Sequence, residues 1–107
     1  IDWYVSIGFK VLDTVEDEDG LNWALLAYGN SEIMVTGGGR STTDDRRDVD
    51  LYIHTDHVEG LYRQLKDRVD VRLGLEDTFY GAREFVIRDP NRYWVTFGQA
   101  LPNAEPV

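Results

Sequence analysis

The sequence contains no cysteine, which excludes disulfides, thiolate metal sites and cysteine nucleophiles and fits an intracellular protein. No apolar run approaches the roughly 20 residues that a membrane span needs. Basic residues are scarce, because 11 Lys and Arg stand against 20 Asp and Glu, a formal net charge of −9. That balance argues against a nucleic-acid backbone or an anionic membrane as partner. We therefore expect a cytoplasmic protein that binds neither.

The acidic excess is concentrated in the first third of the chain. Residues 1–36 hold seven acidic residues and one basic residue, whereas residues 37–107 hold thirteen and ten. One interpretation is a solvated surface that keeps the protein in solution. The other is an electrostatic field that attracts a cationic ligand.

The second half of the chain predicts a β-α-β-β-β unit. The stretch "HVEGLYRQLKDRV" repeats apolar residues at helical spacing, and Asp56 followed by Glu59 has the spacing of a capping box. Strands are predicted from alternation in "DVDLYIHT" before this helix and in "VDVRLGL", "REFVIRD" and "RYWVTFGQ" after it.

The first half repeats this plan without its opening strand. "IDWYVSIGF" predicts the last turns of a helix whose end is marked by Gly8, and "KVLDTVE", "LNWALLAY" and "SEIMVTG" predict three strands. Gly8 and the turn at Gly29 are 21 residues apart, as are Val69 and Pro90 in the second half. We expect two copies of one unit, with a leading strand missing before residue 1.

These copies set the predicted domain organisation, which is one structural domain built from two modules. The first module covers residues 1–36 and the second covers residues 49–107. Residues 37–48, "GGGRSTTDDRRD", are predicted to be a linker. The three glycines do not predict a phosphate-binding loop, because polar turn-forming residues and a strand follow them instead of a helix.

The motifs "WYVSIGF", "VDLYIHTDHVEGLYRQL" and "FYGAREFVIRDPNRYWVTFGQ" resemble the vicinal oxygen chelate superfamily, in particular the metal-free, bleomycin-resistance-like members of the glyoxalase/bleomycin-resistance/dioxygenase group. The resemblance implies an α+β fold in which two βαβββ modules form a curved mixed sheet shaped as a cup, with the helices outside. It also implies a homodimer.

Metal-dependent relatives place His or Glu ligands on the first and last strand of each module. The carboxylate that follows the "DP" turn by seven residues falls here on Thr96, and the usual His position falls on Asp50. The internal repeat aligns Val35 with Thr96, and a shifted alignment would place Met34 or Glu32 there. Thr and Val cannot replace Glu or His on a divalent ion. The resemblance therefore implies no metal, no cofactor and no catalytic residue.

Strand alternation places polar and aromatic side chains together on the expected concave face. Trp, Tyr and His beside Asp suit a flat cationic ligand, which they would hold by stacking, cation–π contacts and a counter-charge. The alternative is that the aromatic rings only fill the core. The predicted ligand-binding residues are Trp23, Ile33, Val35, Asp50, Tyr52, His54, Trp94 and Thr96.

Three functions remain open on the sequence. We favour a non-enzymatic protein that sequesters a cationic aromatic, antibiotic-like small molecule. A metal-dependent lyase, isomerase or dioxygenase of the same superfamily is the second, and an interaction module without a ligand is the third. Superfamily membership fixes the architecture of the site and not its contents.

Overall fold

The computed structural model describes residues 1–37, 43–47 and 49–102. It divides the chain into two compact units, Ile1–Thr42 (unit 1) and Thr43–Val107 (unit 2). Both units combine one helix with an antiparallel or mixed sheet, which confirms the predicted α+β class. No helix in the described ranges is long and apolar enough to cross a membrane.

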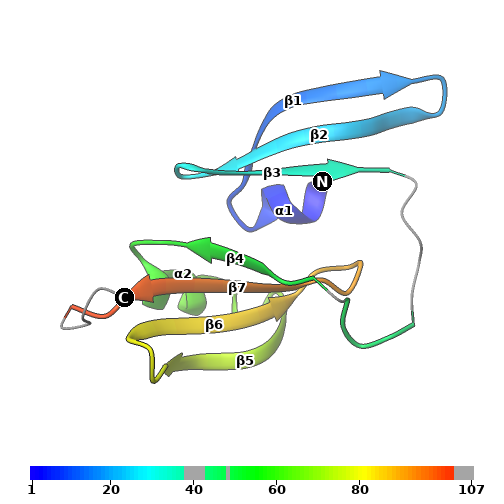
Figure 1. The fold of residues 1–107 in the computed structure, drawn as a ribbon. Helices are drawn as coiled ribbons and strands as arrows, with labels where there is room; N and C mark the ends of the chain where they lie inside the picture. Colours follow the sequence, from blue (N-terminus) through cyan, green and yellow to red (C-terminus); the bar gives the residue numbers. More distant parts are fainter. Residues whose placement is uncertain (38–42, 48, 103–107) are drawn as a thin grey trace. The chain divides into compact units, whose positions relative to one another are not determined.

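Unit 1 is a helical turn followed by a three-stranded antiparallel sheet in the order β1-β2-β3 (Figure 1). Two tight turns join the strands, and Gly20 and Gly29 adopt the positive φ angles of 109° and 57° that these turns require. The predicted strands are confirmed. The elements are α1 (Asp2–Ser6), β1 (Lys10–Asp17), β2 (Gly20–Tyr28) and β3 (Ser31–Thr36).

The core of unit 1 lies where α1 turns into β1. Gly8 makes this turn with φ of 117°, and a Cβ there would lie 3.3 Å from the ring of Tyr28. The ring of Phe9 is 5.3 Å from that of Tyr4 and is also 5.3 Å from that of Tyr28. The predicted helix end at Gly8 is confirmed. The buried residues of unit 1 are Tyr4, Ile7, Phe9, Ala24 and Leu26.

Unit 2 is a complete β-α-β-β-β unit, as predicted. Its sheet has the order β4-β7-β6-β5, in which β4 and β7 run parallel and the other pairs are antiparallel. Figure 1 shows α2 against one face of this sheet. The elements are β4 (Leu51–His54), α2 (Val58–Leu65), β5 (Asp70–Asp77), β6 (Ala82–Arg88) and β7 (Trp94–Ala100).

The start of α2 differs from the predicted capping box. The N-cap is His57 and not Asp56, and no side chain of the cap residue bonds to the helix. The Oε1 atom of Gln99 on β7 accepts the backbone N–H of Val58 at 3.0 Å instead. Glu59 does not reach back to the cap because it pairs with Arg83 on β6. A partner distant in the sequence thus replaces the local cap.

Residues 43–47, which the sequence assigned to the linker, belong to unit 2 and bond to its sheet. Arg72 and Arg88 both donate to the carboxylate of Asp45, and Arg92 donates to the backbone oxygens of Thr43 and Asp44. Of the predicted linker, residues 38–42 and 48 lie outside the described residues. The module boundaries themselves stay predictions.

Candidate functional site

The candidate site is the face of the unit 2 sheet that α2 does not cover, here called the open face. Side chains of paired residues on neighbouring strands share a face. The register pairs Tyr52 with Thr96, His54 with Gly98 and Gly98 with Glu84. The opposite side packs into the core. The open face carries Tyr52, His54, Glu84, Val86, Arg88, Trp94, Thr96 and Gly98.

A buried carboxylate lies in the middle of the open face. Glu84 is only 7% exposed, and both of its oxygens accept hydrogen bonds from tyrosines. The Tyr52 hydroxyl donates to Oε2 and the Tyr80 hydroxyl donates to Oε1, each at 2.5 Å. Burial and the bond to Glu84 raise the pKa of Tyr52, and the bond to Glu84 raises the pKa of Tyr80. Both hydroxyls therefore keep their protons and act as donors at neutral pH.

The position of Tyr52 depends on a glycine in the neighbouring strand. Tyr52 is on β4 and Glu84 is on β6, and β7 runs between them. The Tyr52 ring crosses β7 at Gly98, where a Cβ would overlap the hydroxyl and lie 2.6 Å from Cζ. Gly98 is thus required for the side chain to reach Glu84. The His54 ring lies 4.9 Å from the Tyr52 ring and extends the aromatic surface.

The other end of the open face is rich in arginine. The Cζ atom of Arg46 lies 4.1 Å from the centre of the Trp94 ring, and the same guanidinium pairs with Asp50. Arg72 is 5.6 Å from that ring, and Trp94 donates its Nε1–H to the Asp45 backbone oxygen at 3.3 Å. The chain's own cations therefore contact the ring that the sequence assigned to a ligand.

Most of the predicted site residues of the second module share one face. Tyr52, His54, Trp94 and Thr96 lie together on the open face, as alternation predicts. Asp50 precedes β4 and is held at the surface by Arg46. The role of these residues in binding stays a prediction.

The predicted residues of the first module do not share a face. Ile33 pairs with Leu26 and Val35 pairs with Ala24, and both Leu26 and Ala24 are fully buried. Trp23 pairs with Thr36 instead. Trp23 therefore projects from the opposite side of the sheet, and the prediction that the three residues share a face is wrong. The reason is the tight turn at Gly29, which sets a register between β2 and β3 that alternation in a single strand does not give. Trp23 and Val35 still border one small hollow at the end of the sheet, and the role of the three residues in binding stays a prediction.

The sequence did not predict Glu84 or Tyr80 as site residues, and although alternation places Gly98 on the same face as Trp94 and Thr96, it does not predict that Tyr52 crosses there. A signal was present for Glu84, because it is an acidic residue in "REFVIR", a strand that is otherwise buried along its centre. Tyr80 was not found because it lies in the β5–β6 turn, where alternation says nothing about direction. Their contact depends on three strands coming together, which no local pattern encodes.

Two further features bear on the choice of site. Within the described residues, no group of three or more His, Asp or Glu is placed to hold a metal ion. A hollow of about 400 Å³ lies at the start of α2, bordered by Asp56, Glu59, Arg63 and Arg83. It contains no aromatic ring apart from that of His57, and Arg83 there is paired with Glu59. We therefore place the candidate site on the open face.

Comparison with known proteins agrees with this architecture. The model of the Glyoxalase/Bleomycin resistance protein/Dioxygenase superfamily matches residues 1–97. The chain belongs to this superfamily. No curated protein matches significantly. The superfamily model covers α1 and β1–β6 completely and reaches into β7.

Solved structures support the superfamily fold. TioX from Micromonospora sp. ML1 is 21% identical with a TM-score of 0.72, over 97% of this chain and 87% of that chain. A superfamily member from Alicyclobacillus acidocaldarius is 18% identical with a TM-score of 0.72, over 92% and 79%. A protein of unknown function from Agrobacterium tumefaciens is 19% identical with a TM-score of 0.68, over 92% and 80%. At these identities the likeness concerns the fold alone.

Proposed function

We propose that this superfamily member is a non-enzymatic binding protein that holds a cationic aromatic small molecule on the open face of unit 2. The observation that carries the proposal is the buried carboxylate of Glu84 with two tyrosine hydroxyls donating to it. The Asp50 and Trp94 region extends the same face.

The direction of the two hydrogen bonds favours a cation. Because Tyr52 and Tyr80 donate their protons to Glu84, each hydroxyl oxygen has only acceptor capacity left for a ligand. A bond to a carboxylate also makes the phenol more electron-rich, which strengthens both its oxygen as an acceptor and its ring as a cation–π partner. An ammonium or amidinium group satisfies these acceptors, whereas a ligand carboxylate would be repelled by Glu84.

The rings around Glu84 favour a flat ligand. Tyr52 is 46% exposed and Tyr80 is 51% exposed, so both present ring surface although their hydroxyls are fixed. Phe79, beside Tyr80 in the same turn, is fully exposed. Each stacking contact with such a ring contributes about 1 kcal/mol beyond burial. The net charge of −9 adds long-range attraction for a cation, which salt weakens.

A titration panel tests the proposal. Ethidium, DAPI and a bleomycin-type antibiotic are the cationic probes, and fluorescein and anilinonaphthalene sulfonate are the anionic set. We expect the protein to bind the cationic set and not the anionic set. Failure to bind any cationic probe, or a preference for the anionic set, would contradict the proposal.

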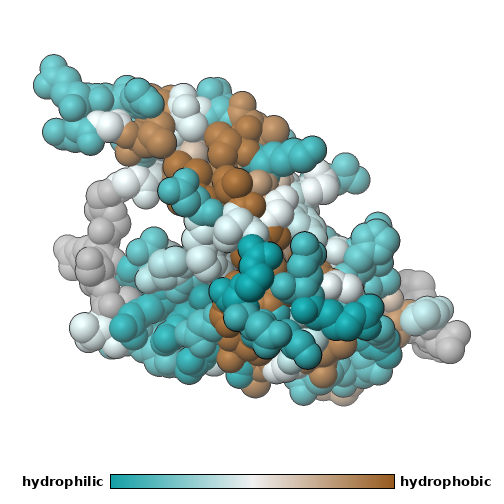
Figure 2. Space-filling model, turned by 180° about the vertical axis from the view of Figure 1, so that it is seen from behind, coloured by the Kyte–Doolittle hydropathy of each residue, from teal (hydrophilic) through white to brown (hydrophobic). Residues whose placement is uncertain are grey.

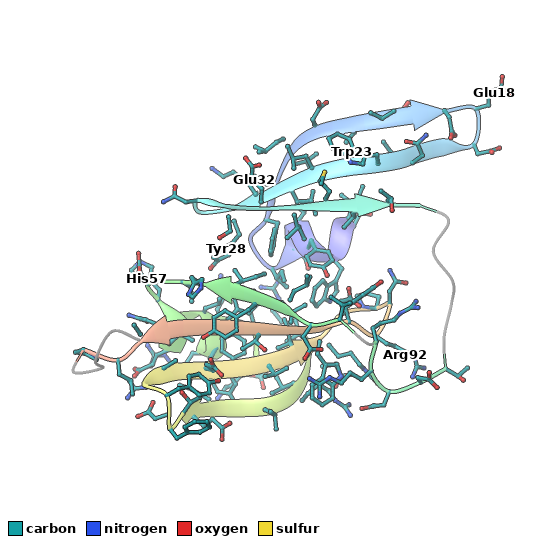
Figure 3. All side chains as sticks on the ribbon, in the orientation of Figure 1. Glu18, Trp23, Tyr28, Glu32, His57 and Arg92 are labelled. Carbon is teal, nitrogen blue, oxygen red and sulfur yellow. The ribbon has the colours of Figure 1, made fainter. Side chains whose placement is uncertain are left out.

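Two variants that each remove one negative charge test where the ligand binds. E84Q removes the buried carboxylate and should weaken binding of the cationic probes by about tenfold, as expected for a charge-assisted interaction. E18Q removes an acid at the tip of the β1–β2 turn (Figure 3) and should change affinity less than about twofold. Circular dichroism verifies that both variants are folded at the titration temperature. Equal effects of the two variants would reject Glu84 as the counter-charge.

A further inference from the structure

The arginine end of the open face has the same chemistry as the site proposed for the ligand. A ring face and a carboxylate, Trp94 and Asp50, meet there at one cation. In the described structure that cation is the guanidinium of Arg46, which belongs to the protein itself. The hydrogen bond to Asp50 raises the pKa of Arg46, so the group stays charged.

Arg46 can leave this position without moving its segment. Residues 43–47 are attached to the sheet by Asp45, which Arg72 and Arg88 both bind, and by the backbone oxygens that Arg92 binds. None of these contacts involves the Arg46 side chain. Displacement of the guanidinium therefore needs only rotation about its side-chain bonds.

The contacts that hold Arg46 are also weak enough for a ligand to replace. Its side chain is 49% exposed and that of Asp50 is 41% exposed. An ion pair between groups of such exposure contributes little, because water screens it. Arg46 makes two hydrogen bonds to Asp50. Arg72, by contrast, is only 28% exposed, bonds to both Asp45 and Asp70, and lies 5.6 Å from the ring, so it is held more firmly and by other partners.

We propose that Arg46 is a tethered cation that occupies a second cation subsite, formed by Trp94 and Asp50, and competes there with the ligand. This inference rests on the proposed function. Gly98, beside Glu84, and Trp94 are four residues apart on β7, a separation of about 13 Å. A flat ligand with a cationic group at each end reaches both subsites. Arg46 then selects such dications, because a small ligand with one cationic group gains too little binding free energy at this subsite to displace the guanidinium.

The first experiment compares binding of DAPI, a flat fluorescent dication, to three variants. R46A empties the subsite and should tighten DAPI binding by about tenfold, the combined value of a lost cation–π contact and a lost surface ion pair. R46K keeps a cation and should stay close to the wild type. R63A is the matched control, because Arg63 on α2 is 71% exposed and its loss changes the net charge equally.

The second experiment follows Arg46 directly by nuclear magnetic resonance. The side-chain protons of Arg46 lie over the Trp94 ring and should be shifted upfield in the free protein. Saturating DAPI should remove this shift, and the same protons of Arg63 should not respond.

The outcomes separate this inference from the proposed function. DAPI affinity that is equal in R46A and R63A, or weaker in R46A, overturns the tethered cation while wild-type binding still supports the function. DAPI that binds without changing the Arg46 shift also overturns it. If neither the wild type nor R46A binds any cationic probe, both proposals fail.

Discussion

At the scale of single residues, the main feature is a carboxylate that the fold has removed from water and given two hydrogen-bond donors. Burial of a charged group is costly unless its acceptors are satisfied, and Glu84 is 7% exposed with both oxygens bonded. An apolar residue in the same place would stabilise the fold about as well as this buried, hydrogen-bonded carboxylate does. A role in binding explains its presence better.

The raised tyrosine pKa values give a prediction in alkaline solution. Tyr52 and Tyr80 should lose their protons at higher pH than they do in the unfolded chain, where the pKa is about 10. Their hydrogen bonds therefore stabilise the fold in full below that pH, and the stabilisation is lost as pH rises through the folded-state values. In a pH titration, absorbance at 295 nm should therefore show a late phase, in which tyrosines ionise only above the usual pH, and Y52F and Y80F should each reduce its amplitude.

The control for this titration is Y62F. Tyr62 lies on α2 with its ring 5.2 Å from that of Phe85, on the other side of the sheet. Y62F serves as the reference for the loss of one tyrosine that lies on the α2 side of the sheet. A late phase that survives in the double variant Y52F/Y80F would show that Glu84 does not hold these protons.

At the scale of the elements, the site depends on strand order. The parallel pairing of β4 with β7 puts β7 between Tyr52 and Glu84, so the tyrosine must cross a strand at a residue without a side chain. Arg83 and Phe85, the neighbours of Glu84 on β6, point to the α2 side. One strand thus serves the core and the site by alternation.

This geometry predicts strong coupling between Gly98 and Tyr52. G98A should displace the Tyr52 ring, break its bond to Glu84 and cost about 1–2 kcal/mol in the free energy of unfolding. In a Y52A background the same substitution should be nearly neutral, so a double-mutant cycle by urea denaturation measures the coupling. G74A is the matched control, since a Cβ there would make an ordinary 3.4 Å contact with Tyr62. If the losses of unfolding free energy in G98A and Y52A simply add in the double variant, the Tyr52 ring does not cross β7 at Gly98.

Local patterns predicted the elements well and the contacts between distant strands poorly. The helix after Asp56 and the strands on either side were predicted because their apolar spacing is set by the local backbone. The face of Trp23 was wrong because it depends on register with β3. Glu84 was missed because its importance comes from Tyr52, 32 residues away in the sequence. The face of Trp23 and the contact of Glu84 both depend on how separate strands pair, which a local pattern does not encode.

At the scale of the whole molecule, charge and exposed apolar surface suggest different partners. The net charge of −9 favours a cationic ligand. Figure 2 shows hydrophobic surface over the strands of unit 1, and apolar surface of this kind is typical of contacts between proteins. The exposed large apolar residues of its strands are Val11, Leu12, Val15, Leu21 and Met34.

We predict that the protein is a homodimer, as the superfamily resemblance implies. Exposed apolar side chains and the edge strands of a sheet are both stabilised by pairing with a second copy of the chain. Light scattering at micromolar concentration should give twice the mass of the 12.3 kDa chain. In this test M34E is the informative variant, because Met34 is 69% exposed and a charge there should weaken an apolar interface. A monomer at high micromolar concentration would refute the prediction.

The most direct test of the binding account is to map a cationic probe onto the chain by nuclear magnetic resonance. Ethidium is added to ¹⁵N-labelled protein, and changes in the backbone amide shifts are followed to saturation. We expect the largest changes on the open face, at Tyr52, His54, Tyr80, Glu84 and Thr96. Changes confined to the hollow at the start of α2, or no saturable changes at all, would contradict it.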